Sequence, residues 1–302
     1  MARTIRSRRV FKDPDFPLAC MRLVDHGATA VHGHDFHELV LILAGSGRHI
    51  MDGVEYPIAA GDVFVVRGAM RHGYRRTDRV TLVNILYHPR RLGLPLHTLR
   101  DTPGYNALFR VEPRLPPPQR CRNRFRLSEE ALAEATGLVF RLEEELRAKR
   151  PGYRGLACAH LMHLIGFLAR AYSETANPLA PPLRKMGEVL SYIEGHLHEP
   201  LSVRDLTRVA GMSESSLLRA FRRILGRSPL EYVIRARILR AADLLRRGDV
   251  RVTEAAFACG FNDSNYFSRQ FRRHTGMTPR AWRRTALGAA APPPPPPGSR
   301  AP

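Results

Sequence analysis

The sequence predicts an α+β protein: a small β-barrel, then a helical segment, then an all-α domain with two helix-turn-helix motifs. Three observations predict this order. Residues 18–88 alternate short apolar segments with Gly and Asp turns, which is typical of β-hairpins. Residues 128–172 carry apolar residues at helical spacing, and residues 202–284 contain one helical pattern written twice. With 302 residues, the chain is long enough for two domains with separate cores.

Composition marks the boundaries between these parts. We expect the barrel and an irregular connection over residues 1–127, the helical segment over 128–176 and the all-α domain over 183–286. Prolines within 174–182 predict an interdomain linker. Residues 288–302 contain six consecutive prolines and predict a disordered tail, with a polyproline ligand as the alternative.

Charge is the strongest compositional signal. The formal net charge is +20, and residues 202–284 hold 18 Arg, no Lys and seven acidic residues. A basic surface of this size indicates a polyanionic partner, most often nucleic acid. The alternative is charge that serves solubility, but these arginines cluster on the predicted helices of the repeat.

Other patterns exclude several classes of protein. No run of roughly 18 apolar residues occurs, and no apolar segment follows the basic N-terminus, so we expect neither a membrane span nor a secretion signal. The four cysteines are scattered without a CxxC pair, which suits a reducing cytoplasm and argues against structural zinc.

The barrel is predicted from short strands at even spacing. A glycine-rich turn at 45–47 is expected to separate the first two strands, and Asp52-Gly53 is a hairpin signal. Many such strands favour a small barrel or a double-sheet jelly roll. The expected strands are Phe36–Leu43, Arg48–Met51, Val54–Ile58, Val63–Val66 and Thr81–Tyr87.

Polar residues interrupt this apolar pattern at particular places. His32, His34 and Glu38 have the same parity, so on one regular strand all three would project to one face. His72 lies at the end of the next hairpin, after Gly61-Asp62. This arrangement resembles the two motifs of the cupin superfamily, and the resemblance implies that these side chains line the barrel mouth.

The second motif departs from the cupin pattern. Arg67 and Ala69 stand where cupins usually have Pro and Gly. The imidazoles and the carboxylate could hold a divalent transition metal with open positions, could hydrogen-bond a small polar ligand, or could form a satisfied polar rim. The resemblance of the chain to effector-responsive regulators, given below, implies that His32, His34, Glu38 and His72 bind an effector, with no metal and no cofactor.

Residues 89–127 are rich in Pro, Gly and Arg and are predicted to be a long irregular connection. Ser128 is expected to cap a helix with Glu129 and Glu130 in its first turn. A second amphipathic helix is predicted over about 155–172. These two helices could form a dimer interface or pack only on their own barrel.

The all-α domain is organised by a repeated unit: a short apolar helix, a glycine turn, and a longer helix rich in arginine. Arg219 and Arg269 are fifty positions apart, whereas the turn glycines Gly211 and Gly260 are separated by forty-nine. The second copy therefore has one extra residue between its turn and its long helix. Both copies carry the signature of a helix-turn-helix. A helix starting at Pro229 is expected to join them.

The turn and helix-boundary residues of the repeat resemble the sequence signature of the AraC-type regulators. The resemblance rests on 210–213, 226–229 and the second copy from Cys259-Gly260-Phe261-Asn262 to Gly276-Met277-Thr278-Pro279. The front half is similar to the rhamnose-responsive activators at 34–40, 65–67, 82–87 and 103–109. This resemblance implies a homodimeric transcription activator, not an enzyme, that binds double-stranded DNA, RNA polymerase and a sugar or sugar derivative.

The long helix of each copy is expected to lie in a major groove, one turn of duplex (roughly 34 Å) from the other. Arg can bridge guanine and Asn can pair with adenine. The two serines in this set could instead be simple helix-start residues. By spacing and resemblance, the base contacts are Ser215, Leu218, Arg219, Ser264, Asn265 and Arg269, and the phosphate contacts are Arg222, Arg223, Arg272 and Arg273.

Three alternatives to a sugar-responsive activator remain open. The first is an AraC-type regulator of a non-sugar metabolite or a stress response. The second is a metal-dependent cupin enzyme fused to a DNA-binding module. The third is non-specific nucleic-acid packaging, which is disfavoured because the two recognition helices differ in sequence. Because the two copies differ, we expect an asymmetric binding site whose discrimination depends more on the second copy.

Overall fold

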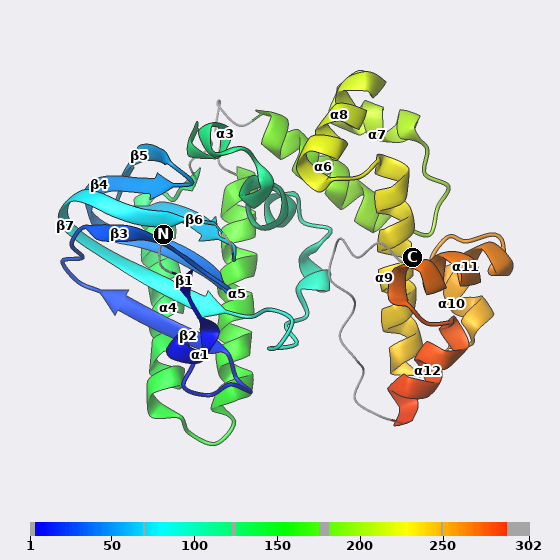
Figure 1. Cartoon of the computed structure of the whole chain (residues 1–302), viewed down its shortest axis with the longest axis horizontal. Helices are drawn as coiled ribbons and strands as arrows, with labels where there is room; N and C mark the ends of the chain where they lie inside the picture. Colours follow the sequence, from blue (N-terminus) through cyan, green and yellow to red (C-terminus); the bar gives the residue numbers. More distant parts are fainter. Residues whose placement is uncertain (1–3, 69, 123–124, 175–180, 249, 289–302) are drawn as a thin grey trace. The chain divides into compact units, whose positions relative to one another are not determined.

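The computed structural model (Figure 1) describes residues 4–68, 70–122, 125–174, 181–248 and 250–288. The chain divides into two compact units, Met1–Ser191 and Tyr192–Pro302. Helix α6 (Pro181–Gly195) crosses this division, and the predicted domain start at residue 183 falls within it. Residues 175–180 of the predicted linker and the predicted tail beyond residue 288 lie outside the described residues.

The described strands of the first unit form one sheet with the order β1-β3-β7-β4-β6-β8, while β2 pairs with β7 and β5 pairs with β4. Every pairing is antiparallel except that of β1 with β3. The strands are β1 Thr4–Ile5, β2 Leu18–Leu23, β3 Thr29–His34, β4 His37–Met51, β5 Val54–Ala59, β6 Asp62–Val66, β7 His72–Tyr87 and β8 Phe125–Arg126, and the short helix α1 spans Ser7–Val10.

Strands β4 and β7 are long and irregular, which corrects the prediction of a turn at 45–47. Their pairing continues from His37↔Tyr87 to Met51↔His72, with register shifts between Ile42 and Arg48. Gly45 supplies the left-handed backbone (φ 78°) that this bulged region needs, and a Cβ there would lie 2.3 Å from a backbone oxygen. The predicted strands 36–43 and 48–51 are therefore two halves of one strand.

The two halves of the long strands enclose a shared core. The first half of β4 pairs with β6, and its second half pairs with β5. One buried cluster combines Val40 and Leu82 from one half of the sheet with Met51 and Tyr74 from the other. Because both halves contribute to one interior, the sheet folds round on itself as the predicted barrel requires.

Residues 89–127 are far more ordered than the predicted irregular connection. They form η1 (Leu96–Leu99), α2 (Pro103–Tyr105), the π-helical η2 (Asn106–Val111), η3 (Glu112–Arg114), α3 (Pro117–Arg122) and β8. Five of the six residues of η2 are buried. Strand β8 pairs with β6, and Arg126 forms an ion pair with the buried Asp62 (Nε–Oδ1 2.8 Å). The segment is thus part of the barrel's packing.

Helices α4 (Glu129–Ala148) and α5 (Tyr153–Glu174) pack against each other beside the sheet (Figure 1). The predicted cap is confirmed, because the Ser128 side chain accepts a hydrogen bond from the Ala131 amide. An ion pair between Arg22 and Glu143 (2.7 Å) joins β2 to α4. No helix within the described ranges is long and apolar enough to cross a membrane.

The second unit contains the repeated motif as predicted. Its helices are α7 (Val203–Ala210), α8 (Glu214–Leu225), α9 (Pro229–Arg247), α10 (Val252–Ala258), α11 (Ser264–Thr275) and α12 (Pro279–Gly288). The long helices α8 and α11 each have 12 residues. Gly211 and Gly260 have positive φ angles at the two turns, and α11 begins one residue later relative to its glycine than α8 does. The extra residue of the second copy is confirmed.

Candidate nucleic-acid interface and effector site

Each recognition helix is anchored by aromatic and aliphatic side chains on one face. Leu217 and Phe221 of α8, and Phe267 and Phe271 of α11, are all fully buried. In the second copy this core includes Ala255, Ala256 and Phe261 from the preceding helix and turn. Burial of one face fixes the opposite face of each helix toward solvent.

The predicted DNA contacts lie on these solvent-facing sides. Leu218 is half-buried, and the other five predicted base contacts are exposed. The four predicted phosphate contacts are also exposed, and they lie toward the C-terminal ends of the two helices. The exposed residues are Ser215, Arg219, Ser264, Asn265 and Arg269, together with Arg222, Arg223, Arg272 and Arg273.

The two serines among these residues do not cap their helices. Ser213 is the N-cap of α8, where its hydroxyl accepts a hydrogen bond from the Ser216 amide. Asp263 caps α11 and accepts from the amides of Asn265 (2.7 Å) and Tyr266 (3.1 Å). The capping function is therefore filled by the preceding residues. The Ser264 hydroxyl makes no hydrogen bond within the described residues, whereas Ser215 Oγ lies 3.3 Å from Ser213 Oγ.

The two candidate base-reading arginines are each held by a neighbour on the same helix. Arg219 donates from Nη2 to the Ser216 hydroxyl (3.2 Å). The Arg269 guanidinium lies over the Tyr266 ring, 6.0 Å from its centroid. An aromatic residue three positions before an arginine on a helix permits such a contact. Sequence reasoning missed Tyr266, although this spacing was visible.

The fifty-residue offset also exposes two positions that sequence reasoning left out. The equivalent of Ser264 in the first copy is Glu214, and the equivalent of Leu218 in the second copy is Ser268. Glu214 is exposed at the first position of α8. A carboxylate there can accept a hydrogen bond from a cytosine amino group.

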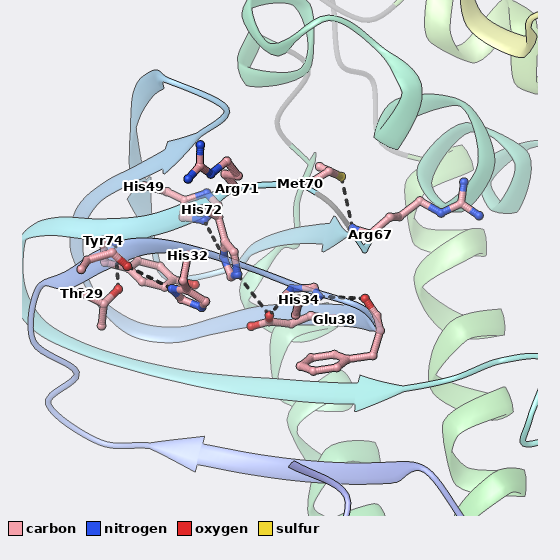
Figure 2. Close-up of polar contacts among 12 residues, drawn as sticks. Thr29, His32, His34, Glu38, His49, Arg67, Met70, Arg71, His72 and Tyr74 are labelled. Atoms are coloured by element: carbon pink, nitrogen blue, oxygen red, sulfur yellow. Dashed lines mark hydrogen bonds and ion pairs between the residues drawn. The ribbon is translucent and has the colours of Figure 1, made fainter. Parts of the chain in front are cut away.

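Inside the barrel, three of the four predicted effector residues converge (Figure 2). His34 Nε2 lies 3.0 Å and His72 Nε2 lies 3.4 Å from the same Glu38 oxygen, Oε2. All three residues are buried. Glu38 stands on β4 while His34 ends β3, because the chain turns at Asp35 and Phe36. The premise of one regular strand was wrong, but the convergence it predicted is present.

His32 lies beside this group and outside its tightest part. It is half-buried, and its Nδ1 is 3.0 Å from the Ala30 carbonyl oxygen. Its ring centroid is 4.5 Å from that of His72. His32 therefore flanks the cluster without placing a nitrogen against Glu38.

The hydrogen bonding of His34 determines what can lie between it and Glu38. Its Nδ1 is 2.8 Å from the Phe36 carbonyl, a contact that requires the proton on Nδ1. With Nδ1 protonated, Nε2 of a neutral ring presents a lone pair toward the carboxylate. The short contact then needs an additional proton or a cation between the two atoms.

The same atoms could hold a metal ion. One donor atom from each of His34, Glu38 and His72 lies within 4.8 Å of the other two. Two imidazoles and a carboxylate suit a divalent transition metal, and the bond from His34 to the Phe36 carbonyl is the usual way to orient such a ligand. The expectation that the barrel binds no metal stays a prediction.

This cluster also includes polar groups that sequence reasoning missed. His49 Nε2 lies 3.5 Å from His72 Nδ1, and His49 Nδ1 lies 2.6 Å from the Tyr56 hydroxyl. The Tyr74 hydroxyl is buried and has no hydrogen-bond partner within the described part of the chain. Burial lowers the pKa of His72 to about 3, so its ring is neutral at pH 7. Strand parity places His49 on the wrong face because the bulges of β4 reverse the alternation.

Comparison with known proteins agrees with both halves of this geometry. Residues 22–165 match the model of the AraC-like ligand binding domain, and residues 206–285 match a helix-turn-helix domain. The chain is 31% identical over 262 residues to the HTH-type transcriptional activator RhaR of Enterobacter sp. (strain 638), which covers 86% of this chain and 89% of the relative. The chain belongs to the AraC family.

The chain is also similar to a second relative and, over part of its length, to a solved structure. The activator RhaS of the same Enterobacter strain is 30% identical over 268 residues, covering 87% of this chain and 91% of the relative. The AraC-type regulator structure from Chromobacterium violaceum is 32% identical, covers 38% of this chain and 100% of its own, and has a TM-score of 0.34. The present chain is thus a DNA-binding regulator of transcription with an effector-binding domain.

Proposed function

We propose that this AraC-family regulator activates transcription in the cytoplasm when a sugar or sugar derivative binds in its barrel. The main support is the unsatisfied polar interior. His34 Nε2 and His72 Nε2 face only the Glu38 carboxylate, and the Tyr74 hydroxyl has no partner among the described residues. Buried polar groups without partners are rare, and a ligand with several hydroxyl groups would satisfy them. The two named relatives are activators. The resemblance of the front half to the rhamnose-responsive activators makes L-rhamnose one proposed effector.

At the DNA we propose that α8 and α11 occupy successive major grooves. The exposed Ser215, Leu218 and Arg219 would read one groove, and Ser264, Asn265 and Arg269 the next. The arginines Arg222, Arg223, Arg272 and Arg273 would contact phosphates and set the affinity and its dependence on salt.

We propose that α4 and α5 form the interface of a homodimer. Each helix exposes one large apolar residue: Phe140 of α4 is 61% exposed and Leu156 of α5 is 51% exposed. Replacing Phe140 with Glu should shift the protein from dimer to monomer in sedimentation velocity, because a charge would be buried at the interface. Val24→Glu is the matched control, since Val24 is exposed on a loop. A Phe140→Glu variant that stays as dimeric as the control contradicts this interface.

The effector site has a second candidate ligand. The close approach of His34, Glu38 and His72 favours a metal ion, and with it a metal-dependent enzyme fused to a DNA-binding module. Metal analysis of the purified protein separates the two functions. One tightly held Fe, Mn or Zn per chain would favour the enzyme, whereas the regulator predicts no stoichiometric metal.

The direct test of the proposed function is transcription in vitro with purified RNA polymerase from the promoter beside the regulator's own gene. L-rhamnose and a panel of related sugars should increase the transcript from this promoter. The variant Glu38→Gln should keep DNA binding but lose the response, because the carboxylate lies at the centre of the buried cluster. A response that survives in Glu38→Gln contradicts the placement of the effector, and repression by every sugar contradicts activation.

A further inference from the structure

We propose that the ligand-binding domain has a second site, outside the barrel interior, that takes a small organic or inorganic oxyanion. The site is formed by Arg67, Tyr87 and Tyr105, between the outer face of the sheet and the α2–η2 segment. It goes beyond the sugar response proposed above and does not depend on it.

Arg67 points away from the barrel cluster. It directly follows β6, whose last residue, Val66, is part of the interior core. Successive side chains on a strand alternate between faces, so Arg67 lies on the outer side. Figure 2 shows its guanidinium directed away from His34 and Glu38. Strand β6 packs against η2, which brings the start of that helix to the same face.

The groups that act electrostatically on Arg67 are two tyrosines and two arginines. Burial lowers the pKa of Arg67, the hydroxyls of Tyr87 and Tyr105 raise it, and Arg110 and Arg90 lower it further. Tyr87 and Tyr105 are both buried. Within the described part of the chain, the Arg67 guanidinium makes no hydrogen bond or ion pair. Arg67 is half-buried. An arginine that lies beside other cations and has no carboxylate partner favours the binding of an anion that neutralises it.

The neighbouring strand pair has the same character. His37 and Tyr87 are paired across β4 and β7, with ring centroids 5.6 Å apart. Burial, followed by the charges of Arg67 and His88, lowers the pKa of His37 to about 3. His37 is thus a neutral ring in cationic surroundings, and its N–H can donate a hydrogen bond to a bound oxyanion.

The backbone beside the site is unusual in its own right. Residues Asn106–Val111 form a π-helix, and they begin directly after Tyr105. π-helical turns are rare and often occur at functional sites. This observation is independent of the charges and marks the same place.

The site has a connection to α6. Asn106 is fully buried, accepts from Arg110 Nη1 (2.6 Å) and donates to the Arg100 carbonyl (2.6 Å) and to the Ser191 hydroxyl of α6 (2.9 Å). An anion that moves Tyr105 would move Asn106, the next residue. The anion could shift α6 between two conformations only by as much as its binding free energy differs between them.

Isothermal titration calorimetry with the full-length protein tests the proposal. The probes are inorganic phosphate, L-rhamnonate and, as a neutral molecule of similar shape, L-rhamnose. Phosphate or rhamnonate should bind, more weakly at high salt, and Arg67→Gln should weaken that binding at least about tenfold through loss of a charge-assisted hydrogen bond. Arg71→Gln, which removes the same charge from an exposed position four residues away, should change it less than twofold.

Two further variants make the outcome decisive. Tyr105→Phe should also weaken anion binding. This variant tests the site if Arg67→Gln does not fold. Glu38→Gln should bind the anion like the wild type, because Glu38 lies in the barrel interior. Absence of anion binding in the wild type, equal binding by Arg67→Gln, or equal losses in Glu38→Gln and Arg67→Gln would each overturn the proposal. Binding of neutral L-rhamnose tests only the proposed effector.

Discussion

Arg269 and Arg272 lie three residues apart on the exposed face of α11, and we expect them to make different contacts with DNA. Arg269 is near the N-terminal half of α11, over the Tyr266 ring, while Arg272 is in its last turn. Arg269→Ala should weaken binding to the specific site by about 1–3 kcal/mol and leave non-specific binding nearly unchanged. Arg272→Ala should weaken both and reduce the slope of log affinity against log salt by about 1.

The measurement is a salt titration of both variants on specific and unrelated DNA. The two arginines serve as controls for each other, since each substitution removes one positive charge from the same helix. Equal losses on both DNAs for Arg269→Ala would leave it a phosphate contact only.

At the scale of single residues, the sequence predicted the members of the barrel cluster better than their geometry. His34, Glu38 and His72 could be named because polar residues stood out in apolar strands. His49 could not, since its place in the interior depends on where β4 bulges. Tyr74 could not, since it lies outside the predicted strand Thr81–Tyr87. Register shifts arise from pairing between strands, which the local sequence does not encode.

Among the elements, the turn of the second helix-turn-helix gives the sharpest stability prediction. Gly260 has φ +79°, and a Cβ there would lie 2.4 Å from the Leu197 carbonyl oxygen. Gly276 also has φ +79°, but nothing lies within 4 Å of its Cβ position. Gly276→Ala should cost about 1 kcal/mol for the left-handed backbone alone, and Gly260→Ala should cost clearly more because of the added clash.

Chemical denaturation of the two variants and the wild type checks this comparison. The φ angles are matched, so a difference between the variants reports the contacts of the added Cβ with the Leu197 carbonyl oxygen and the Arg237 guanidinium. Equal free energies of unfolding for Gly260→Ala and Gly276→Ala would show that this close approach has no energetic consequence.

The helices of the second unit were predictable because caps, turn glycines and apolar spacing agree along most of the repeat, the N-terminus of α10 at Arg251 being an exception. Ser202 and Ser228 form capping boxes, and Pro229 begins α9 as expected. Residues 89–127 were not predictable as elements. Their short helices are stabilised by burial against the barrel and α5, which overrides a local sequence rich in Pro and Arg.

For the whole molecule, the buried His72 and the half-buried His37 predict how stability depends on pH. Burial is the main reason that the pKa values of His37 and His72 fall to about 3. The unfolded values lie near 6.5, so between about pH 6.5 and 3 the unfolded chain binds more protons and the folded state loses stability as pH falls. From pH 7 to pH 5 each histidine should cost about 1–2 kcal/mol.

Denaturation of the wild type and of His37→Gln at both pH values measures this effect. The variant should show a smaller loss of stability on acidification than the wild type, by the contribution of one histidine. An equal loss in the two proteins would mean that His37 titrates in the folded state as it does in the unfolded chain.

The central claim is that one chain reads two successive major grooves with two non-equivalent helices. Selection of binding sites from random DNA tests it most directly, with the wild type, Arg219→Ala and Arg269→Ala compared. We predict two blocks of sequence preference about one helical turn apart, with Arg219→Ala erasing preference in one block and Arg269→Ala in the other. Unchanged preferences with a uniform loss of affinity in both variants would contradict the claim.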